Sequence, residues 1–410
     1  MKITKLELIK VPPSWVWIKI HTDEGIVGLG EPYLENHADA VIAEVQRIEP
    51  FLIGQDPTRV EHLWQVMYNS GLGYKGGPIK MSAISGIDIA LWDIAGKAAG
   101  LPIHKLLGGA TRDRIKMYRA TGGALPHFVQ PGEPYRAGYN RTNQSTNQST
   151  DRNTKGQKSD YNDPETWAEA ARILTQEWGF RALKVHFGPG EGLEVTSRVD
   201  RYGELFAAVR AGAGPDVDVA VDIHNPHPAI ANQMIEVLAP HRPLFIEEPM
   251  PIERVDALVD IARRTNAAIA AGERWMGKWI FFDALSRGAI SVLQPDICHA
   301  GGITECHKIA VMGEAAFAKV ALHCPLSPLA LAASIQLDAV LPNFLVQEHN
   351  EVIDWREDGR TYFGKGYLKE PFVLDEDGCV QVPQAPGLGI ELDEEGMTEI
   401  MARPWSSQRG

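Results

Sequence analysis

The sequence has few cysteines and no long apolar run, and each absence excludes a class of protein. Only four of the 410 residues are cysteine and none forms a C-x-x-C pair, so a disulfide framework is not expected and a reducing cytoplasm is the simplest compartment. No stretch approaches the roughly 18 uninterrupted apolar residues of a membrane span. The N-terminus interleaves charge and proline, unlike the apolar segment of a signal peptide.

A scarcity of positive charge excludes further partners. Forty Lys and Arg residues stand against fifty-three Asp and Glu residues, which gives a formal net charge of −13. No long basic run is present, so we expect neither a nucleic-acid backbone nor an anionic membrane as a partner. An acidic protein that binds an acidic small molecule needs a local positive centre, such as a metal ion. With 44% apolar and 23% charged residues, the composition is otherwise typical of a globular protein.

The hydrophobic pattern divides the chain into three parts. Residues 1–113 begin with alternating apolar and polar positions, typical of antiparallel strands joined by a tight turn, and continue with helical periodicity. We therefore expect an α+β capping domain there. Residues 114–355 repeat a strand, a loop and a helix. Residues 356–410 are polar, turn-rich and strand-like, and we expect them to return to the capping domain.

The middle part predicts a barrel. Eight short β-rich runs alternate with amphipathic helical stretches, and most run ends lie about 25 residues apart, as helical crossovers between parallel strands require. We predict an α/β fold, a modified TIM (β/α) barrel with a capping domain formed by the N-terminal region and the C-terminal tail. A doubly wound open sheet is the alternative. It more often has a glycine-rich phosphate turn after its first strand, which ATGG at 120–123 does not supply.

Residues 124–163 interrupt the first repeat. The segment is rich in Pro, Gly, Asn, Gln, Ser and Thr and contains the direct repeat NQSTNQST, a composition typical of a mobile surface insertion. It nevertheless follows a barrel strand, and such loops emerge on the face that carries barrel active sites. A lid over that face is therefore a second hypothesis.

Ionisable side chains recur at one position of the repeat, near the ends of seven successive strands. They are Lys184, His186, Asp222, His224, Glu247, Glu248, Glu273, Asp296, His323 and Glu348. Taken singly, each has an ordinary explanation, such as a glutamate that favours a helix N-terminus or a lysine that extends along the barrel wall. Independent preferences do not explain the repetition. In a barrel these side chains would converge on one mouth.

Three of the carboxylates predict a metal site. Asp222, Glu247 and Glu273 end consecutive strands, and carboxylates in a dry cleft repel one another unless a cation lies among them. Hard oxygen ligands suit Mg²⁺, whereas the absence of Cys ligands and of an H-E-x-x-H motif argues against zinc. His323, one strand after Asp296, is placed as a base whose tautomer a carboxylate fixes. The chemistry suggested is proton abstraction from a carbon next to a carboxylate.

Longer motifs resemble the enolase superfamily. They run along almost the whole chain outside the insertion and include TDEGIVGLGEP, the Asp-x-His at 222–224, LFIEEP, IAAGER, VLQPD, HAGGITEC, HCPLSPLAL and VQEH. Together they resemble the mandelate racemase subgroup, and within it the acid-sugar dehydratases of the D-galactonate dehydratase kind. The resemblance implies a homo-oligomer that uses one Mg²⁺ per subunit. It also implies removal of the C2 proton of a sugar acid and elimination of its C3 hydroxyl, which gives a 2-keto-3-deoxy acid.

The resemblance also implies roles for individual residues. It assigns Mg²⁺ ligation to Asp222, Glu247 and Glu273, removal of the C2 proton to His323 paired with Asp296, protonation of the leaving hydroxyl to His224, and a hydrogen bond to the enolate oxygen to Glu348. Further substrate contacts are expected from Lys184, His186 and His299, and from Trp17 and Glu31 in a lid of the capping domain. The HAGG turn that His299 opens is also a candidate phosphate site.

Two departures from the resemblance leave alternatives open. Residues 184–186 read Lys-Val-His, whereas the pattern of the galactonate dehydratases at this place is Lys-x-Asn. His186 could therefore be a second base, a sugar ligand or a neutral hydrogen-bonding group. NPHP at 225–228 replaces a Gly-Arg pair. A second base opposite His323 would predict racemisation or epimerisation at C2 instead of elimination. A barrel that retains metal binding without catalysis is the third hypothesis.

Overall fold

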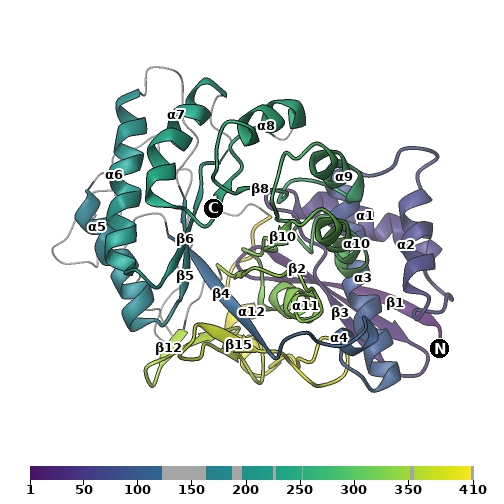
Figure 1. Ribbon diagram of the computed structural model, residues 1–410. Helices are drawn as coiled ribbons and strands as arrows, with labels where there is room; N and C mark the ends of the chain where they lie inside the picture. Colours follow the sequence, from purple (N-terminus) through teal and green to yellow (C-terminus); the bar gives the residue numbers. More distant parts are fainter. Residues whose placement is uncertain (122–162, 187–195, 225–227, 252, 351–354, 408–410) are drawn as a thin grey trace.

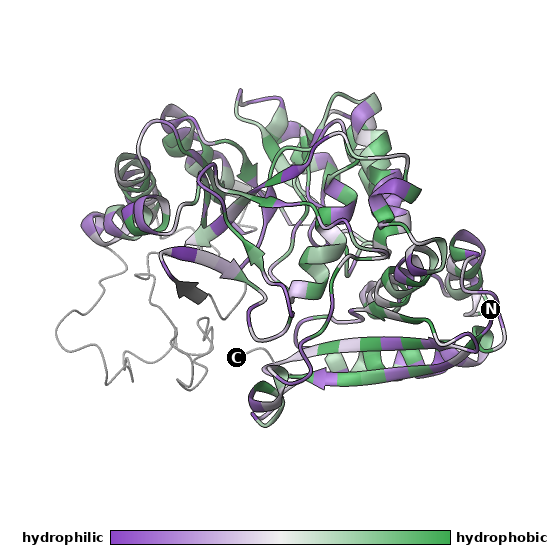
Figure 2. Cartoon of the chain, turned by 90° about the horizontal axis from the view of Figure 1, so that it is seen from below, coloured by the Kyte–Doolittle hydropathy of each residue, from purple (hydrophilic) through white to green (hydrophobic). Residues whose placement is uncertain are grey.

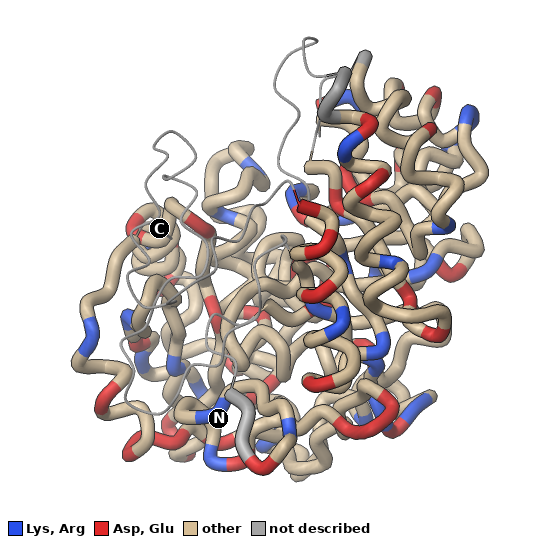
Figure 3. Tube along the Cα trace, turned by 90° about the vertical axis from the view of Figure 1, so that its left-hand side faces the viewer, with Lys and Arg blue, Asp and Glu red and all other residues tan. Residues whose placement is uncertain are grey.

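The computed structural model describes residues 1–121, 163–186, 196–224, 228–251, 253–350 and 355–407. The insertion expected at 124–163, and with it the lid hypothesis, lies outside the described residues except for its last position. Figure 1 shows the N-terminal elements on one side and the barrel on the other, with the yellow C-terminal segment along the lower edge. Acidic and basic positions are interspersed along the trace (Figure 3). Within the described ranges, no helix is both long and apolar enough to cross a membrane.

The capping domain consists of an antiparallel sheet and a set of helices. Its strands are β1 (Ile3–Val11), β2 (Trp15–Thr22) and β3 (Val27–Gly30), and its helices are α1 (Ala38–Ile48), α2 (Val60–Asn69), α3 (Pro78–Ala99) and α4 (Ile103–Leu106), with a turn of 3-10 helix at Glu49–Phe51. The hairpin of β1 and β2 alternates hydrophobic and hydrophilic residues along its length (Figure 2). Backbone hydrogen bonds from Thr22 to Ile26 and from Gly25 to Thr22 close the next turn. The predicted strands, turn and helices are therefore confirmed.

Glycines bring β3 against helix α3. A Cβ atom added at Gly30 would overlap the backbone oxygen of Gly86, and one at Gly28 would overlap that of Ala90. The strand can therefore lie directly on the helix backbone, a close approach that only glycine permits. This contact fixes the chain that leaves β3, which carries Glu31 and Glu35 toward the barrel.

The barrel consists of eight parallel strands in chain order. They are β4 (Arg114–Thr121), β5 (Ala182–His186), β6 (Asp218–Asp222), β7 (Ile246–Glu247), β8 (Ile269–Ala271), β9 (Val292–Leu293), β10 (Lys319–Val320) and β11 (Gln347–Glu348). β11 pairs with β4, and a parallel bridge between Val320 and Phe344 joins β10 to the chain entering β11. The ring is thereby closed, so the barrel prediction is confirmed and the open-sheet alternative is wrong. Each predicted β-rich run contains one of these strands.

Seven helices connect successive strands. They are α5 (Pro164–Arg172), α6 (Thr196–Ala213), α7 (Pro228–Leu238), α8 (Val255–Ala262), α9 (Lys278–Ser286), α10 (Gly302–Ala315) and α11 (Pro328–Asp338), with a π turn at Ile173–Glu177 and a 3-10 turn at Ala239–His241. After β11 the chain continues into β12 (Trp355–Glu357). One buried side chain from each strand or its immediate flank fills the barrel: Tyr118, Ala182, Ala220, Phe245, Ala270, Val292, Ala321 and Val346. The interior is therefore a packed core, and the chemistry must lie at an end of it.

The C-terminal segment contacts both the barrel and the capping domain. It contains β13 (Arg360–Phe363), β14 (Phe372–Val373), β15 (Cys379–Gln381) and α12 (Met397–Met401). β15 pairs antiparallel with β4, and the Trp405 indole N–H donates to the Trp15 carbonyl at 2.8 Å. The boundaries drawn at residues 113 and 355 stay predictions.

One buried carboxylate joins three segments of the fold. Asp93 of α3 accepts hydrogen bonds from the backbone N–H groups of Leu29 at 2.9 Å and Leu388 at 2.8 Å, and pairs with Lys97 at 2.6 Å. Both backbone donors are buried. Removal of their acceptor would therefore carry the full desolvation cost of each group.

We predict that Asp93→Ala lowers the free energy of unfolding by about 2 to 4 kcal/mol, because two buried N–H groups lose their acceptor. The matched control is Asp283→Ala, since Asp283 is 53% exposed in its ion pair with Arg287 and such pairs contribute about 0 to 1 kcal/mol. Thermal unfolding measured by calorimetry checks the difference. Equal melting temperatures for the two variants would contradict the role of Asp93.

Candidate active site

The ionisable residues predicted at strand ends do gather at one mouth of the barrel. His186, Asp222, Glu247 and Glu348 are the last residues of their strands. The others lie within a strand or one to three residues beyond it: Lys184, His224, Glu248, Glu273, Asp296 and His323. Parallel strands of a closed barrel end at the same face, so the fold alone brings these groups together.

Lys184 is a buried cation between two buried carboxylates. Its ammonium nitrogen lies 2.9 Å from Glu247 Oε1 and 3.0 Å from Glu348 Oε1. Burial lowers the pKa of a lysine, but the two carboxylates outweigh burial and raise the pKa of Lys184 well above its usual value. In the same way, burial opposes ionisation of Glu348, whereas Lys184 and His323 hold its pKa below the usual value. The cation therefore joins β5, β7 and β11 across the mouth.

Two of the three predicted metal ligands show the effect expected of like charges, whereas neighbouring imidazoles outweigh burial and hold the pKa of Asp222 well below its usual value. Burial raises the pKa of Glu273 well above its usual value, and the charges of Glu247 and Asp222 raise it further. Burial also raises the pKa of Glu247. A divalent cation would relieve both effects, and carboxylate oxygens are ligands that Mg²⁺ prefers. The donor set thus fits a hard metal ion.

The structure groups the potential ligands differently from the predicted trio. Among the described residues, two sets place their donor atoms within 4.8 Å of one another: His186, Asp222 and His224, and His224, Glu248 and Glu273. Glu247 belongs to neither set, because its oxygens face Lys184 and the Gln294 amide, which donates at 2.7 Å. The site therefore contains carboxylate and imidazole groups that can hold a metal, while the trio of Asp222, Glu247 and Glu273 stays a prediction.

His323 and Asp296 form the expected pair. His323 Nδ1 lies 2.7 Å from Asp296 Oδ2, which fixes Nδ1 as the donor. The other ring nitrogen, Nε2, lies 3.3 Å from Glu273 Oε2. Burial disfavours the imidazolium, but Asp296 and Glu348 outweigh burial and raise the pKa of His323. The hydrogen bond to Asp296 thus fixes the tautomer of the ring, and Nε2 faces Glu273.

His186 and His224 both contact Asp222 on the other side of the mouth. His186 Nδ1 lies 2.7 Å from Asp222 Oδ2, and the backbone N–H of His224 donates to Asp222 Oδ1 at 2.8 Å. The two rings meet edge to face with centroids 5.1 Å apart. His224 has φ 49°, a left-handed conformation uncommon outside glycine that often marks functional positions. Asp222 therefore orients both imidazoles.

The structure places Trp17 and Glu31 in a buried network at the start of α11. The Trp17 indole N–H donates to Ser327 Oγ at 2.9 Å, the Ser327 hydroxyl contacts the Glu31 carboxylate, and the Ala330 N–H donates to Glu31 at 3.2 Å. Both predicted residues are fully buried. The structure does not bring either into contact with the carboxylates of the mouth, so their substrate contacts stay predictions.

His299 lies behind the predicted base. It is buried, with Nδ1 3.1 Å from Ser82 Oγ and Nε2 3.2 Å from Glu35 Oε2. Nε2 is also 3.8 Å from Asp296 Oδ2. Its surroundings are thus side chains of the capping domain and the partner of His323, and the predicted substrate contact stays untested.

The sequence reasoning missed two residues that hold the carboxylates. Arg274 forms an ion pair with Glu248, and its Nε lies 3.3 Å from Glu273. Gln294 donates to Glu247. Both lie inside the motifs IAAGER and VLQPD, so the signal was present. However, a motif does not show which way a side chain points once its strand has ended.

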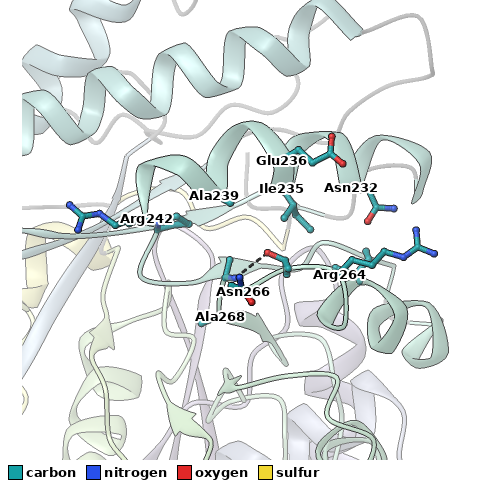
Figure 4. Close-up of a pocket in the computed structure, with 12 residues that line it drawn as sticks. Asn232, Ile235, Glu236, Ala239, Arg242, Arg264, Asn266 and Ala268 are labelled. Atoms are coloured by element: carbon teal, nitrogen blue, oxygen red, sulfur yellow. Dashed lines mark hydrogen bonds between the residues drawn. The ribbon is translucent and has the colours of Figure 1, made fainter.

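A separate cleft of about 590 Å³ lies at the opposite end of the barrel. It is lined by residues that precede β7 and β8, including Pro243, Ala267 and Ala268, and therefore opens at the amino ends of these strands. Figure 4 shows Arg242 and Arg264 pointing away from each other at its two ends. The side chains thus present no convergent charge, and none of the mouth carboxylates lines this cleft.

Comparison with known proteins identifies the class to which this fold and site belong. Residues 11–108 match the family model for the mandelate racemase/muconate lactonizing enzyme N-terminal domain, and residues 166–396 match that for the enolase C-terminal domain-like family. The chain belongs to the mandelate racemase/muconate lactonizing enzyme family of the enolase superfamily. The predicted resemblance is therefore confirmed.

Particular relatives are similar over nearly their whole length. A D-galactonate dehydratase from Pectobacterium atrosepticum is 40% identical over 401 residues, 97% of this chain and 94% of the relative. One from Klebsiella pneumoniae is 41% identical over 405 residues, 98% and 95% of the two chains. Among solved structures, an enolase from Agrobacterium radiobacter with bound sodium and L-malate has a TM-score of 0.79 at 29% identity, covering 99% of this chain and 96% of its own.

We predict a pH-dependent stability from Glu31. Burial raises its pKa from 4.5 to about 8, so between these values the folded state keeps a proton that the unfolded chain has released. Stability then falls as pH rises through this window, by at most about 1.4 kcal/mol per pH unit. The glutamine of Glu31→Gln cannot titrate. The melting temperature of this variant minus that of the wild type should therefore increase from pH 5 to pH 8.

The control for this prediction is Glu394→Gln, because the Glu394 side chain is 79% exposed. Its difference from the wild type should stay constant over the same pH range. A pH-independent difference for Glu31→Gln as well would show that Glu31 is ionised in the folded protein.

Proposed function

We propose that the protein is a Mg²⁺-dependent dehydratase of an aldonic acid, with D-galactonate or a related acid as substrate. The reaction class, dehydration of a sugar acid by a hydro-lyase, is confirmed by the D-galactonate dehydratases that are about 40% identical over almost the full chain. The observation that carries the proposal is the arrangement of the mouth. The His323–Asp296 pair lies on one side of the carboxylates, and His224 lies on the other.

Asp222, Glu247 and Glu273 would hold the cation. When bound, Mg²⁺ supplies positive charge beside the substrate carboxylate and lowers the cost of removing the C2 proton, as in other enolase-superfamily sites. The same cation would offset the repulsion that raises the pKa of Glu273. It would also supply the positive centre that an acidic protein needs in order to bind an acid. L-malate bound to the Agrobacterium relative is itself a small hydroxy acid.

The residues of the chain divide the proton transfers between them. His323 Nε2 takes the C2 proton, while its Nδ1–H stays bonded to Asp296, which stabilises the imidazolium that forms. His224 gives a proton to the C3 hydroxyl, which leaves as water as the C2–C3 double bond forms. The enol that results tautomerises to the 2-keto-3-deoxy acid. No oxidant or reductant is needed, because the elimination is redox-neutral.

Lys184 and Glu348 act at the substrate carboxylate in this proposal. Lys184 contacts the carboxylate, and Glu348 is assigned to the enolate oxygen. An ionised carboxylate only accepts hydrogen bonds. Because Lys184 holds the pKa of Glu348 low, the hydrogen atom directed at the enolate oxygen comes from the Lys184 ammonium. The proposal also includes substrate contacts from His186, Trp17 and Glu31, a homo-oligomeric assembly and a cytoplasmic location.

The decisive test is a panel of aldonic and aldaric acids incubated with the purified protein and Mg²⁺. Semicarbazide detects 2-keto-3-deoxy products. EDTA should abolish turnover, and added Mg²⁺ should restore it. An absence of keto-acid formation across the panel would refute the proposal and leave the racemase or epimerase and the non-catalytic barrel as explanations.

We predict that His323→Asn and His224→Asn each lower kcat by about 10² to 10⁴, the usual contribution of a general base or acid. His62→Asn is the control, because His62 is an exposed histidine of α2. Steady-state kinetics on the substrate found in the panel measures the effect. If either site variant kept the wild-type kcat, the role assigned to that histidine would be wrong.

His186→Asn separates dehydration from the alternative of racemisation or epimerisation. His186 contacts Asp222 and His224, which favours a role as a sugar ligand or as support for His224. We therefore expect the variant to raise KM or lower kcat by about 10-fold or less, with keto acid still the product. Product analysis in D₂O checks this. Deuterium at C2 of recovered substrate with inverted configuration, lost in His186→Asn, would favour the racemase instead.

A further inference from the structure

One face of helix α3 holds the loop between β9 and α10. Three α3 side chains spaced three residues apart, hence on one face of the helix, contact this loop or the first turn of α10. The pairs are Ser82 with His299 at 3.1 Å, Ser85 with the Gly301 N–H at 2.9 Å, and Asp88 with the Thr304 N–H at 3.0 Å. The capping domain therefore fixes the loop that begins at Asp296, the partner of the proposed base.

His299 is the member of this interface that reaches the catalytic pair. Its Nε2 lies between Glu35 Oε2, at 3.2 Å, and Asp296 Oδ2, at 3.8 Å. The same Oδ2 atom lies 2.7 Å from His323 Nδ1. Asp296 is fully buried, and its Oδ2 atom faces two imidazoles, those of His323 and His299. One belongs to the base, and the other is held by the capping domain.

Charge supports the same arrangement. Burial disfavours the imidazolium of His299, but Asp296 and Glu35 outweigh burial and raise its pKa to about 9. A protonated ring donates from both nitrogens, and both nitrogens of His299 face oxygen atoms. A protonated His299 can therefore donate from Nε2 toward Asp296 Oδ2, the oxygen that faces His323 Nδ1.

We propose that His299 is a positioning residue that couples docking of the capping domain, through Glu35 and Ser82, to the orientation of the Asp296–His323 pair. Glu35 follows β3, the strand that glycines hold against α3. Correct seating of this segment therefore completes the surroundings of Asp296. The inference rests on the proposed function in that His323 is taken as the base. It gives His299 a role that needs no contact with substrate.

The test compares His299→Ala with Ser85→Ala. Both remove one contact between α3 and this loop, but Ser85 contacts the Gly301 N–H and the Met81 carbonyl of its own helix, neither of which belongs to the catalytic pair. We expect His299→Ala to lower kcat on the order of 10-fold, as loss of an orienting partner typically does, with KM changed less than about 2-fold. His299→Gln retains a donor and should recover most of kcat. Ser85→Ala should keep the wild-type kcat even if its melting temperature falls.

A second readout does not depend on turnover. The His323 Nδ1–H bonded to Asp296 should give a downfield proton NMR resonance, assigned by its loss in His323→Asn. We expect it to shift or broaden in His299→Ala, to return toward its wild-type position in His299→Gln, and to be unchanged in Ser85→Ala. If His299→Ala does not fold, the resonance of His299→Gln is compared with that of the wild type. We expect a small shift between these two proteins.

The two readouts separate the two ideas. If no sugar acid is turned over by the wild type, the proposed function fails, and the resonance alone still decides whether His299 positions Asp296 and His323. An unchanged resonance in His299→Ala or, where that variant does not fold, in His299→Gln would overturn the inference. The inference would also be overturned if kcat and melting temperature fell together, and to the same extent, in the His299 and Ser85 variants. A contact that only stabilises the fold would then explain the loss of kcat in both.

Discussion

Asp222, Glu247 and Glu273 are carboxylates that β6, β7 and β8 bring into one buried region, where burial and neighbouring carboxylate charge raise the pKa of the two glutamates. The closed ring of backbone hydrogen bonds holds them there, since an open sheet would let the strand ends diverge. Partial relief comes from Lys184, from Gln294 and Arg274, and from the imidazoles around Asp222. In the proposed function, the remaining repulsion favours the binding of a cation. Substrate binding and proton abstraction both depend on that cation in the proposed mechanism.

The sequence predicted the barrel and its mouth because both follow from periodicity. Strands that alternate with helices must run parallel, and residues at equal positions in the repeat must share one face. Side-chain direction beyond a strand end follows no period. Glu248 and His224 illustrate this, because their left-handed backbones turn each side chain in a way that no local pattern indicates. Trp17 and Glu31 were expected at a lid, and the structure places them inside the junction with α11.

The junction between the two domains explains why such residues were hard to assign. Its contacts join positions more than 200 residues apart, as in the pairs of Ser82 with His299 and Asp88 with Thr304. A single sequence does not show which residues far apart in the chain come into contact. The glycines of β3 were visible, but their reason became clear only when the strand was seen against the backbone of α3. A polar residue in the capping domain can therefore serve the junction with the barrel, which composition alone cannot show.

This junction also bears on how the site controls its own chemistry. In the proposed mechanism, a base that removes a weakly acidic proton must be held in one tautomer, and Asp296 does this for His323. Asp296 is fully buried, so groups of the protein must satisfy its oxygens. Besides His323, the Cys298 N–H donates to Oδ1 at 2.7 Å, and His299 Nε2 lies 3.8 Å from Oδ2. Glu35 of the capping domain contacts the His299 ring. The barrel thus supplies the groups proposed to react, and the capping domain holds a histidine beside the carboxylate that orients the proposed base.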